Sequence, residues 1–467
     1  MKYPSQPLRA SQPSDNPRSD VGTTRRAALR ALGGGGLTTA GVLAAACGGQ
    51  PENKPVASGQ PVDLRVHLVK KSDVSDWIET GLAQDIDGWK AKHPKVNVIL
   101  ETVAGFTNEF NPAVISYAAS GTLGDLVWNA PRHRSHIAWG TKYKIVRELN
   151  SLASAAKYDT SAIAKGAIDN SSWENKLYWW IYISEPVVPV IAVNKNKVEQ
   201  LGLKVPADDW TFAELTDWAK RATTQDAWGY FRADAGNAPF AMAPFLRQWG
   251  VEPVNKEGTK ATFSATQDAF VNALTYRYNL TSLKVSPNPK DGSIDAPGWF
   301  GNGKILAMDS WPFRIQGLPD TYKDLKVEFV LTPTVRKGDK RRSMLNEHVF
   351  GVTTASKNPG TAFEFLTWIG GKEMNVQGLV QAAKGPIARN DVWADTRITD
   401  RWPAFKKLKP VADTIEPDYL VANWRGIDFD NAFSGVMANV EKGDVAPATA
   451  ASEIQRLCQE LLDKEPA

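Results

Sequence analysis

The side chains that could do chemistry in this sequence are chiefly aromatic and hydrogen-bonding ones. The chain has 467 residues, of which 17 are tryptophan. An indole offers a flat apolar face with an N–H donor at its edge, which suits a protein core and also suits stacking on a sugar ring. We expect most of these indoles to pack in the core and a few to line a ligand site. Carboxylates, amides and guanidinium groups beside them would pair with hydroxyls.

Two local patterns suggest ion chemistry, and neither is complete. Residues 298–304 have the glycine and lysine spacing of a phosphate-binding loop, but Ile305 stands where a Mg²⁺-binding Ser or Thr is required. His133 and His136 could supply half of a zinc site, but no second cluster of ligands accompanies them, so we expect solvated surface histidines. The sequence therefore predicts no cofactor and no metal.

One stretch contains the densest group of aromatic candidates. An aromatic strand is predicted at 177–183, where Trp179 and Trp180 point to opposite faces, so that one can enter a core while the other faces a cleft. Glu185 follows, and prolines separate this strand from a second apolar run at 187–193. The prediction is a strand, a crossing point and a second strand.

Other candidates depend on where the strands of a sheet end. Alternating apolar residues predict strands at 62–69 and 96–101 with a helix between them, which is a βαβ unit. A short buried strand is predicted at 125–130, with Trp128 and Asn129 at its carboxyl end. Open α/β sheets bind ligands at that end, although Trp128 fits a core position equally well.

Charged residues beside aromatic ones supply a last group of candidates. Glu347 and His348 begin a predicted strand, where they could bond a polyol or form a structural pair. Trp424, Arg425 and Asp428 precede the last helices, and on a loop there they could close over a ligand.

The N-terminal segment has the features of an export signal. Residues 24–30 carry a twin-arginine pattern, the weakly apolar stretch 31–46 is too short to span a bilayer, and small residues then precede Cys47. This order predicts a twin-arginine lipoprotein signal peptide over 1–46, with Cys47 lipidated. Residues 47–61 would be a flexible tether with a root-mean-square span of roughly 20 Å, holding the protein at the outer face of the cell membrane.

The net charge of +4 comes from that leader. Residues 1–46 hold six basic and two acidic residues, which leaves 49 of each in the rest of the chain. The balance gives no charge-based reason to expect a nucleic-acid partner. Cys458 is the only other cysteine, so no disulfide can form within the chain once Cys47 is modified, and its helical surroundings predict a buried thiol.

Several segments resemble, in order, the extracellular solute-binding proteins of ABC importers, in the sugar-binding family. The matching segments are 175–178, 193–195, 200–215, 300–311, 356–366 and 385–389. The resemblance implies an α/β, two-lobed periplasmic-binding-protein-like fold with three interlobe crossovers, whose lobes close on a ligand by hinge motion. It also implies that Trp311 and Arg314 lie near the cleft.

The same resemblance implies the division of the chain and its function. The first lobe would comprise 62–185 and 305–350, and the second 186–304 and 351–467. The expected protein is a monomeric, non-enzymatic receptor that binds a carbohydrate in an aromatic-lined cleft and delivers it to the transmembrane subunits of an ABC permease. The alternatives are a secreted glycoside hydrolase, for which no motif places the required pair of carboxylates, and a binder of another polar solute on the same fold.

Overall fold

The computed structural model describes residues 61–70, 76–103, 107–130, 134, 136–186, 190–232, 239–291, 294–310, 318–381, 387–403, 405–407, 415–423 and 425–464. All of them belong to the second of the two units into which the chain divides, Asn53–Ala467. The expected signal peptide, Cys47 and nearly all of the tether lie outside the described residues, as do Trp311, Arg314 and Trp424.

The first sheet has six strands within the described residues and is built on the predicted βαβ unit. β1 (Val62–Val69) and β2 (Val96–Val103) pair in parallel, and α1 (Asp76–Lys92) connects them. The strand order is β12-β11-β3-β1-β2, with β6 paired to β11. These other strands are β3 (Leu126–Asn129), β6 (Trp180–Pro186), β11 (Ser343–Val352) and β12 (Ile415–Glu416).

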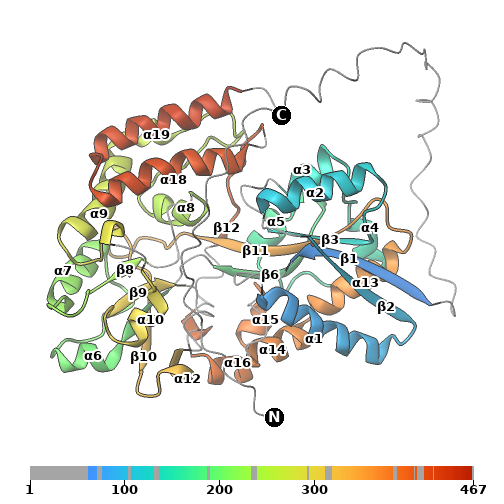
Figure 1. Ribbon diagram of the computed structural model, residues 1–467, viewed down its shortest axis with the longest axis horizontal. Helices are drawn as coiled ribbons and strands as arrows, with labels where there is room; N and C mark the ends of the chain where they lie inside the picture. Colours follow the sequence, from blue (N-terminus) through green and yellow to red (C-terminus); the bar gives the residue numbers. More distant parts are fainter. Residues whose placement is uncertain are drawn as a thin grey trace, which may run out of the picture. The chain divides into compact units, whose positions relative to one another are not determined.

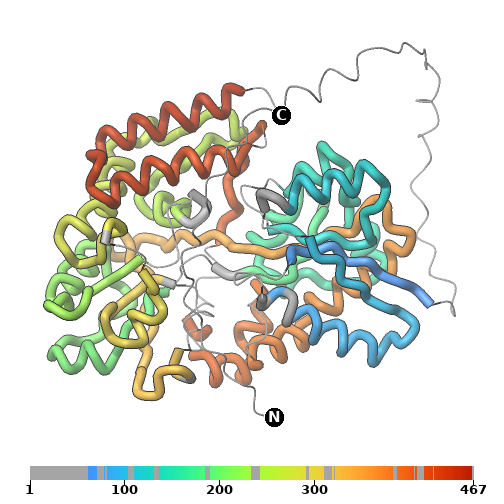
Figure 2. Tube along the Cα trace, viewed as in Figure 1, coloured from blue at the N-terminus to red at the C-terminus, as the bar shows by residue number. Residues whose placement is uncertain are grey.

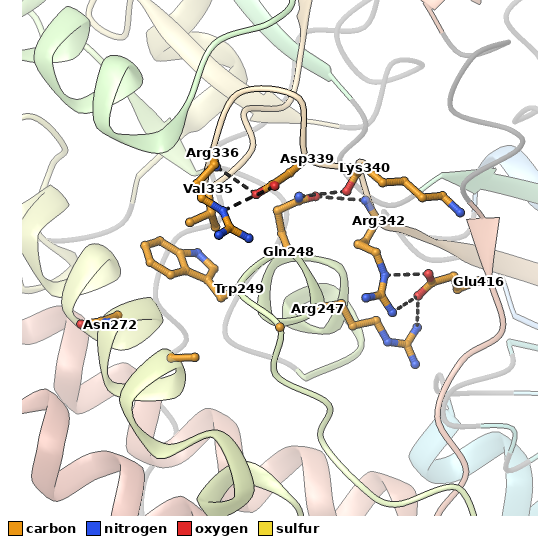
Figure 3. A pocket seen from close by; sticks show the side chains of 12 residues that line it. Arg247, Gln248, Trp249, Asn272, Val335, Arg336, Asp339, Lys340, Arg342 and Glu416 are labelled. Carbon is orange, nitrogen blue, oxygen red and sulfur yellow. Dashed lines mark hydrogen bonds and ion pairs between the residues drawn. The ribbon is translucent and has the colours of Figure 1, made fainter.

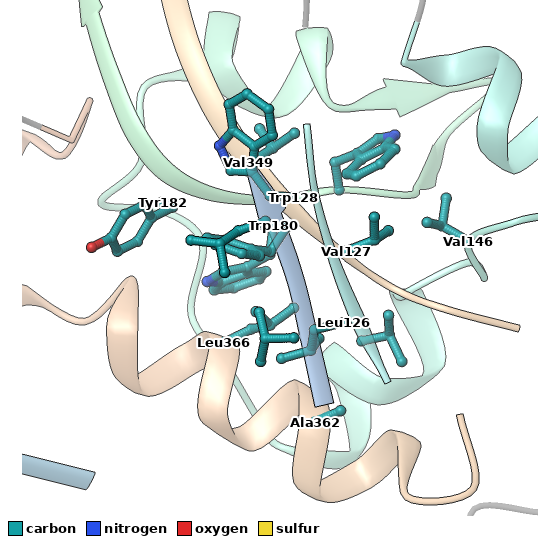
Figure 4. Close-up of a cluster of buried hydrophobic side chains, with 14 of the residues drawn as sticks. Leu126, Val127, Trp128, Val146, Trp180, Tyr182, Val349, Ala362 and Leu366 are labelled. Atoms are coloured by element: carbon teal, nitrogen blue, oxygen red, sulfur yellow. The ribbon is translucent and has the colours of Figure 1, made fainter. Parts of the chain in front are cut away.

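We call this sheet and the helices packed on it the first lobe. Strands β3 and β6 share one apolar core with α13, to which Trp128, Trp180 and Leu366 contribute (Figure 4). In Figure 1 the orange α13 accordingly lies beside the blue and teal strands of this sheet. Its further elements are α2 (Thr107–Ala119), α3 (Ile137–Thr141), α4 (Asn150–Ala155), α5 (Lys165–Asn170), α13 (Pro359–Ile369), α14 (Lys372–Val380), α15 (Asn390–Trp393), α16 (Thr396–Arg401) and the pair β4 (Ser172–Trp173) and β5 (Lys176–Leu177).

The second sheet has four strands among the described residues, in the order β10-β7-β9-β8. β7 (Val190–Asn194) is buried along its whole length and pairs antiparallel with β10 (Val327–Leu331) and β9 (Ala307–Ser310). β8 (Phe231–Arg232) pairs in parallel with β9, so both of these strands end at the same edge of the sheet.

The second lobe consists of this sheet and its helices. In α7 a capping box of Thr211 and Glu214 satisfies the first turn, while Leu215 and Trp218 bury one face of the helix. The helices are α6 (Lys195–Gln200), α7 (Phe212–Ala222), α8 (Pro239–Gln248), α9 (Gln267–Ser282), α10 (Ala296–Gly301), α12 (Leu318–Thr321), α18 (Gly426–Lys442) and α19 (Pro447–Leu462), with the short 3₁₀ helices η1 (Phe263–Thr266) and η2 (Pro289–Asp291). Cys458 of α19 is fully buried, as predicted.

The chain passes between the two lobes three times. It leaves the first lobe between β6 and β7, returns between β10 and β11, and leaves again between α16 and α18. Figure 2 follows the second passage along the orange segment that contains β11. An apolar cluster joins residues of both sheets near these passages, including Ile181, Leu345, Val190 and Leu331.

The lobe boundaries expected from the sequence require correction. Residues 305–350 were expected in the first lobe, but β9 and β10 pair with β7 in the second sheet. Residues 351–467 were expected in the second lobe, but α13 packs in the core of the first. The apolar pattern identifies a strand or helix correctly and carries no information about which sheet it joins, because that choice depends on pairing between distant segments.

No helix in the described part of the chain is both long and apolar enough to cross a membrane.

Candidate ligand-binding site

The carboxyl end of β3 brings several of the predicted residues together. β3 runs parallel to β1 and antiparallel to β11, in a register that places Asn129 opposite Val349 and Trp128 opposite Phe350. Trp128 is fully buried and stacks on the ring of His348, with centroids 5.6 Å apart and planes 22° apart. Trp128, Asn129, Glu347 and His348 therefore form one group, although the sequence offered them as two separate pairs.

The regular pairing of β11 is interrupted beside this group. The pairing of β11 with β6 shifts register between His348 and Val349, the geometry of a β-bulge. A bulge bends its strand and re-aims the side chains beside it, and bulges are frequent next to functional sites. Here it lies on a strand that carries the chain from one lobe to the other, beside the predicted Glu347–His348 pair.

Glu347 has an unusual environment for a carboxyl group. It has no exposed surface, and the side-chain amide of Asn170 donates a hydrogen bond to its Oε2. Its Oε1 has no hydrogen-bond partner among the described residues. Burial raises the pKa of Glu347 to about 8, and the negative charge of Asp418 acts in the same direction. The group is thus a buried, largely protonated carboxyl with one oxygen still able to form hydrogen bonds.

Asn170, at the end of α5, links Glu347 to two further segments. Its backbone oxygen accepts a hydrogen bond from Nε2 of His136 at 3.0 Å, and its side-chain oxygen accepts one from the backbone N–H of Asp418 at 3.4 Å. His136 is buried, which lowers its pKa to about 3, with the nearby charge of Arg134 adding to the effect. The prediction of a solvated His136 was therefore wrong, because its ring packs beside Trp179 and bonds to Asn170.

The neighbouring indoles Trp179 and Trp180 both lie in the first-lobe core. Trp179 donates from Nε1 to the backbone oxygen of His136 at 3.0 Å. Trp180 makes edge-to-face contacts with Tyr158 at 4.6 Å and Phe363 at 5.1 Å. Their exposed fractions are 0% and 2%, so in this structure neither ring faces a cleft, and ligand contact by either one stays a prediction.

The remaining predicted residues lie outside the group at the end of β3. Arg425 and Asp428 lie at the start of α18 and form an ion pair with each other at 3.3 Å. Glu185 is part of β6, at the predicted crossing point, but its side chain is outside the described part of the structure, like Trp311, Arg314 and Trp424.

The second lobe presents a charged group that sequence reasoning missed. Arg232 is the last residue of β8 and Asp309 is the last but one of β9. Their side chains pair at 3.5 Å, with exposed fractions of 9% and 2%. Arg277 of α9 is buried nearby, and burial together with the charge of Arg232 lowers its pKa to about 9. Ligands of α/β sheets bind beyond the carboxyl ends of parallel strands, which is where this pair stands.

These arrangements favour recognition of hydroxyl groups rather than ion coordination. Among the described residues, no group of three or more His, Cys, Asp or Glu side chains could hold a metal ion. Carboxyl, amide, imidazole and guanidinium groups offer both donors and acceptors, as hydroxyls require.

Sequence signals for the missed residues were weak. Asn170 stands in a polar, turn-rich segment, and Arg232 and Asp309 are single charges in short strands that no motif marks. Only the parallel pairing of β8 with β9 reveals that the last two are neighbours.

Comparison with known proteins identifies the family to which the chain belongs. Residues 86–407 match the family described as bacterial extracellular solute-binding protein. No curated protein matches the chain.

Solved structures similar to this chain include several sugar complexes. An ABC substrate-binding protein of Listeria monocytogenes, solved with cycloalternan, is 18% identical with a TM-score of 0.70 and covers 86% of this chain and 99% of its own. The GacH receptor of Streptomyces glaucescens, solved with acarbose, is 20% identical with a TM-score of 0.69, covering 87% and 100%. Maltose-bound MalE3 of T. maritima is 16% identical with a TM-score of 0.70, covering 86% and 100%. The likeness confirms the predicted two-lobed α/β fold with three crossovers.

Proposed function

This chain belongs to the family of bacterial extracellular solute-binding proteins, and from that premise we propose that it binds a carbohydrate and delivers it to the permease of an ABC importer. The observation that carries the proposal is the family match over residues 86–407, joined to a fold shared with proteins solved with cycloalternan, acarbose and maltose. All three of those ligands are carbohydrates.

The proposed site lies between the strand ends of the two lobes. Asn129, Glu347 and His348 supply hydrogen-bonding groups from the first lobe, and Trp128 positions His348 by stacking on it. Arg232 and Asp309 supply the second-lobe side. These groups are largely buried in this structure, so we propose that a ligand reaches them when the lobes open and is enclosed when they close.

Specificity would come from complete pairing of the ligand's hydroxyls. A hydroxyl left without a partner in a closed site costs roughly 1–3 kcal/mol, so a sugar whose hydroxyls do not match the fixed groups is rejected. Glu347 adds to this specificity, because its Oε1 lies beside the bulge and has no partner among the described residues, so that it can bond to a ligand hydroxyl.

Other predicted residues complete the proposed site. Glu185, Trp311, Arg314 and Trp424 would approach from the passages between the lobes, and Arg425 with Asp428 from the start of α18. Trp179 and Trp180 would act from the core by fixing the entry into β6.

The proposed receptor makes and breaks no covalent bond. It would act as a monomer, anchored by lipid on Cys47 to the outer face of the cell membrane, with the 47–61 segment as its tether. The leader pattern of the sequence supports this placement.

Titration calorimetry of the purified mature chain against glucose, maltose, maltotriose, cellobiose and acarbose tests the proposal. We expect saturable binding of at least one of these sugars. Asp309→Asn should weaken that binding at least tenfold, while Asp217→Asn, at an exposed position of α7, should leave it unchanged. Absence of heat with every sugar, from a chain shown to be folded by circular dichroism, would refute the proposal.

A further inference from the structure

We propose that the second lobe carries a separate pocket for a neutral sugar, between α8, α9 and the segment that leads into β11. The pocket has a volume of about 770 Å³, within the range of small-molecule sites. Residues that line it include Arg247, Trp249, Asn272, Asp339, Arg342 and Glu416. The pocket goes beyond the proposed function, because Arg342 precedes Glu347 by five residues, roughly 16 Å along an extended strand.

One wall of the pocket is an indole. Trp249 is partly exposed and has one face stacked on Phe212, with centroids 5.8 Å apart and planes 19° apart. Its Nε1 is buried and has no hydrogen-bond partner among the residues that the structure describes. Figure 3 shows this indole across the pocket from Arg342 and Glu416. A fixed aromatic wall suits the apolar face of a sugar ring.

The opposite wall is a set of paired charges. Arg342 holds Glu416 through two contacts, Nε–Oε1 at 2.6 Å and Nη2–Oε2 at 2.7 Å. Arg247 contacts the same carboxylate at 3.8 Å and donates to the backbone oxygen of Pro417 at 3.0 Å. Glu252 completes the set, at 2.9 Å from Arg247 and 3.1 Å from Arg342.

These ion pairs favour an uncharged ligand. Each guanidinium that lines the pocket already faces a carboxylate, so a charged ligand would have to displace an existing partner at these groups. Lys340 also lines the pocket, as an exposed ammonium group on its rim. A hydroxyl donates and accepts at once, and can join the pairs without breaking them. The wall of paired charges therefore matches a neutral polyhydroxylated ligand.

The rim of the pocket is fixed before any ligand arrives. The side chain of Gln248 donates to the backbone oxygen of Lys340 at 3.1 Å and accepts from the backbone N–H of Arg342 at 3.0 Å. Asp339 accepts from the backbone N–H of Arg336 at 3.0 Å. Groups held in this way lose little freedom on binding, which favours affinity. Asn272 is exposed on α9 and lines the pocket, so it offers a side chain that can be enlarged without touching the core.

Fluorine NMR of the mature chain labelled with 5-fluorotryptophan tests the pocket directly. Trp249→Phe identifies the Trp249 resonance by its loss. The probes are maltose, cellobiose and lactose, with inorganic phosphate as an anionic comparison. We expect the Trp249 resonance to shift saturably with at least one of the sugars and to stay unchanged with phosphate. Asn272→Leu should raise the apparent Kd at least tenfold, while Asn439→Leu, an exposed position of α18 outside the pocket, should not change it.

The outcomes separate this pocket from the proposed receptor site. A Trp249 resonance that stays fixed with all three sugars, or that moves only with phosphate, overturns the pocket. If other tryptophan resonances shift with sugar while that of Trp249 does not, the result supports the receptor function and refutes the pocket. If the Trp249 resonance alone shifts, the result supports the pocket and shows that the site between the strand ends does not bind these three sugars.

Discussion

The carboxyl of Glu347 shows how the fold can change the chemistry of a single residue. Burial raises its pKa to about 8 from an ordinary value of 4.5, while the hydrogen bond from Asn170 acts in the opposite direction. The folded chain therefore binds a proton more tightly than the unfolded chain does. The stability that this protonation provides is fully present below pH 4.5 and is lost as the pH rises toward 8.

We predict that Glu347→Gln removes this pH dependence. The melting temperature of the variant should rise relative to that of the original chain from pH 5 to pH 8, because only the original chain must take up a proton at this position when it folds. The slope corresponds to at most about one proton, roughly 1 kcal/mol per pH unit. Glu364→Gln, at an exposed position of α13, serves as the control and should show no such trend. Parallel melting curves for Glu347→Gln and the original chain would contradict the assignment.

Sequence reasoning found several site residues but not their arrangement. Trp128 was a candidate because it ends a buried strand, and Glu347 because it begins one. Their proximity depends on the register of β3 with β11, which joins segments far apart in the sequence. Trp179 and Trp180 show the opposite case, because alternation along a strand predicts two faces without saying that both faces are covered.

At the scale of the elements, local signals predicted strands and helices well. The alternation of β1 is encoded within a few residues, and this strand forms over 62–69 as predicted. The capping box of α7 is a local signal of the same kind. The assignment of elements to lobes failed for β9, β10 and α13, because the same apolar pattern fits either sheet. The close packing of β11 in the first lobe can be tested by substitution.

Gly351 of β11 lies where a larger side chain has no room. A Cβ at this position would stand 2.5 Å from Cγ1 of Val146 and 3.1 Å from the ring of Trp179. We predict that Gly351→Ala lowers the free energy of unfolding by about 1–3 kcal/mol, measured by chemical denaturation. Gly435→Ala in α18 is the matched control, because it meets open space and should stabilise its helix by roughly 0.5–1 kcal/mol. Equal effects at the two positions would show that β11 is not packed as described.

For the whole molecule, we propose that two lobes hinge on their ligand while a lipid anchor holds the protein at the membrane. Three passages join the lobes, and the bulge of β11 lies on one of them. Such connections allow closure by changes in a few residues.

Closure should be visible in solution. We predict that a sugar bound in the calorimetric panel lowers the radius of gyration measured by small-angle X-ray scattering, because the lobes enclose it. A sugar from the panel that does not bind is the control. A radius that is the same with and without saturating ligand would exclude hinge closure as the mode of binding.

The anchor can be tested with the two cysteines of the chain. We predict that Cys47→Ala moves most of the protein from the membrane fraction to the soluble fraction of a bacterial host, because the lipid attachment site is lost. Cys458→Ala should leave the protein at the membrane, since this thiol is buried in the second lobe. Retention of the Cys47→Ala chain at the membrane would refute lipid anchoring at this residue.

The most direct test of the receptor model is a crystal structure of the mature chain with the tightest-binding sugar of the panel. We predict that the sugar lies between the carboxyl ends of β3 and β9, with hydrogen bonds to Glu347 or His348 on one side and to Arg232 or Asp309 on the other. A sugar bound away from both strand ends would contradict it.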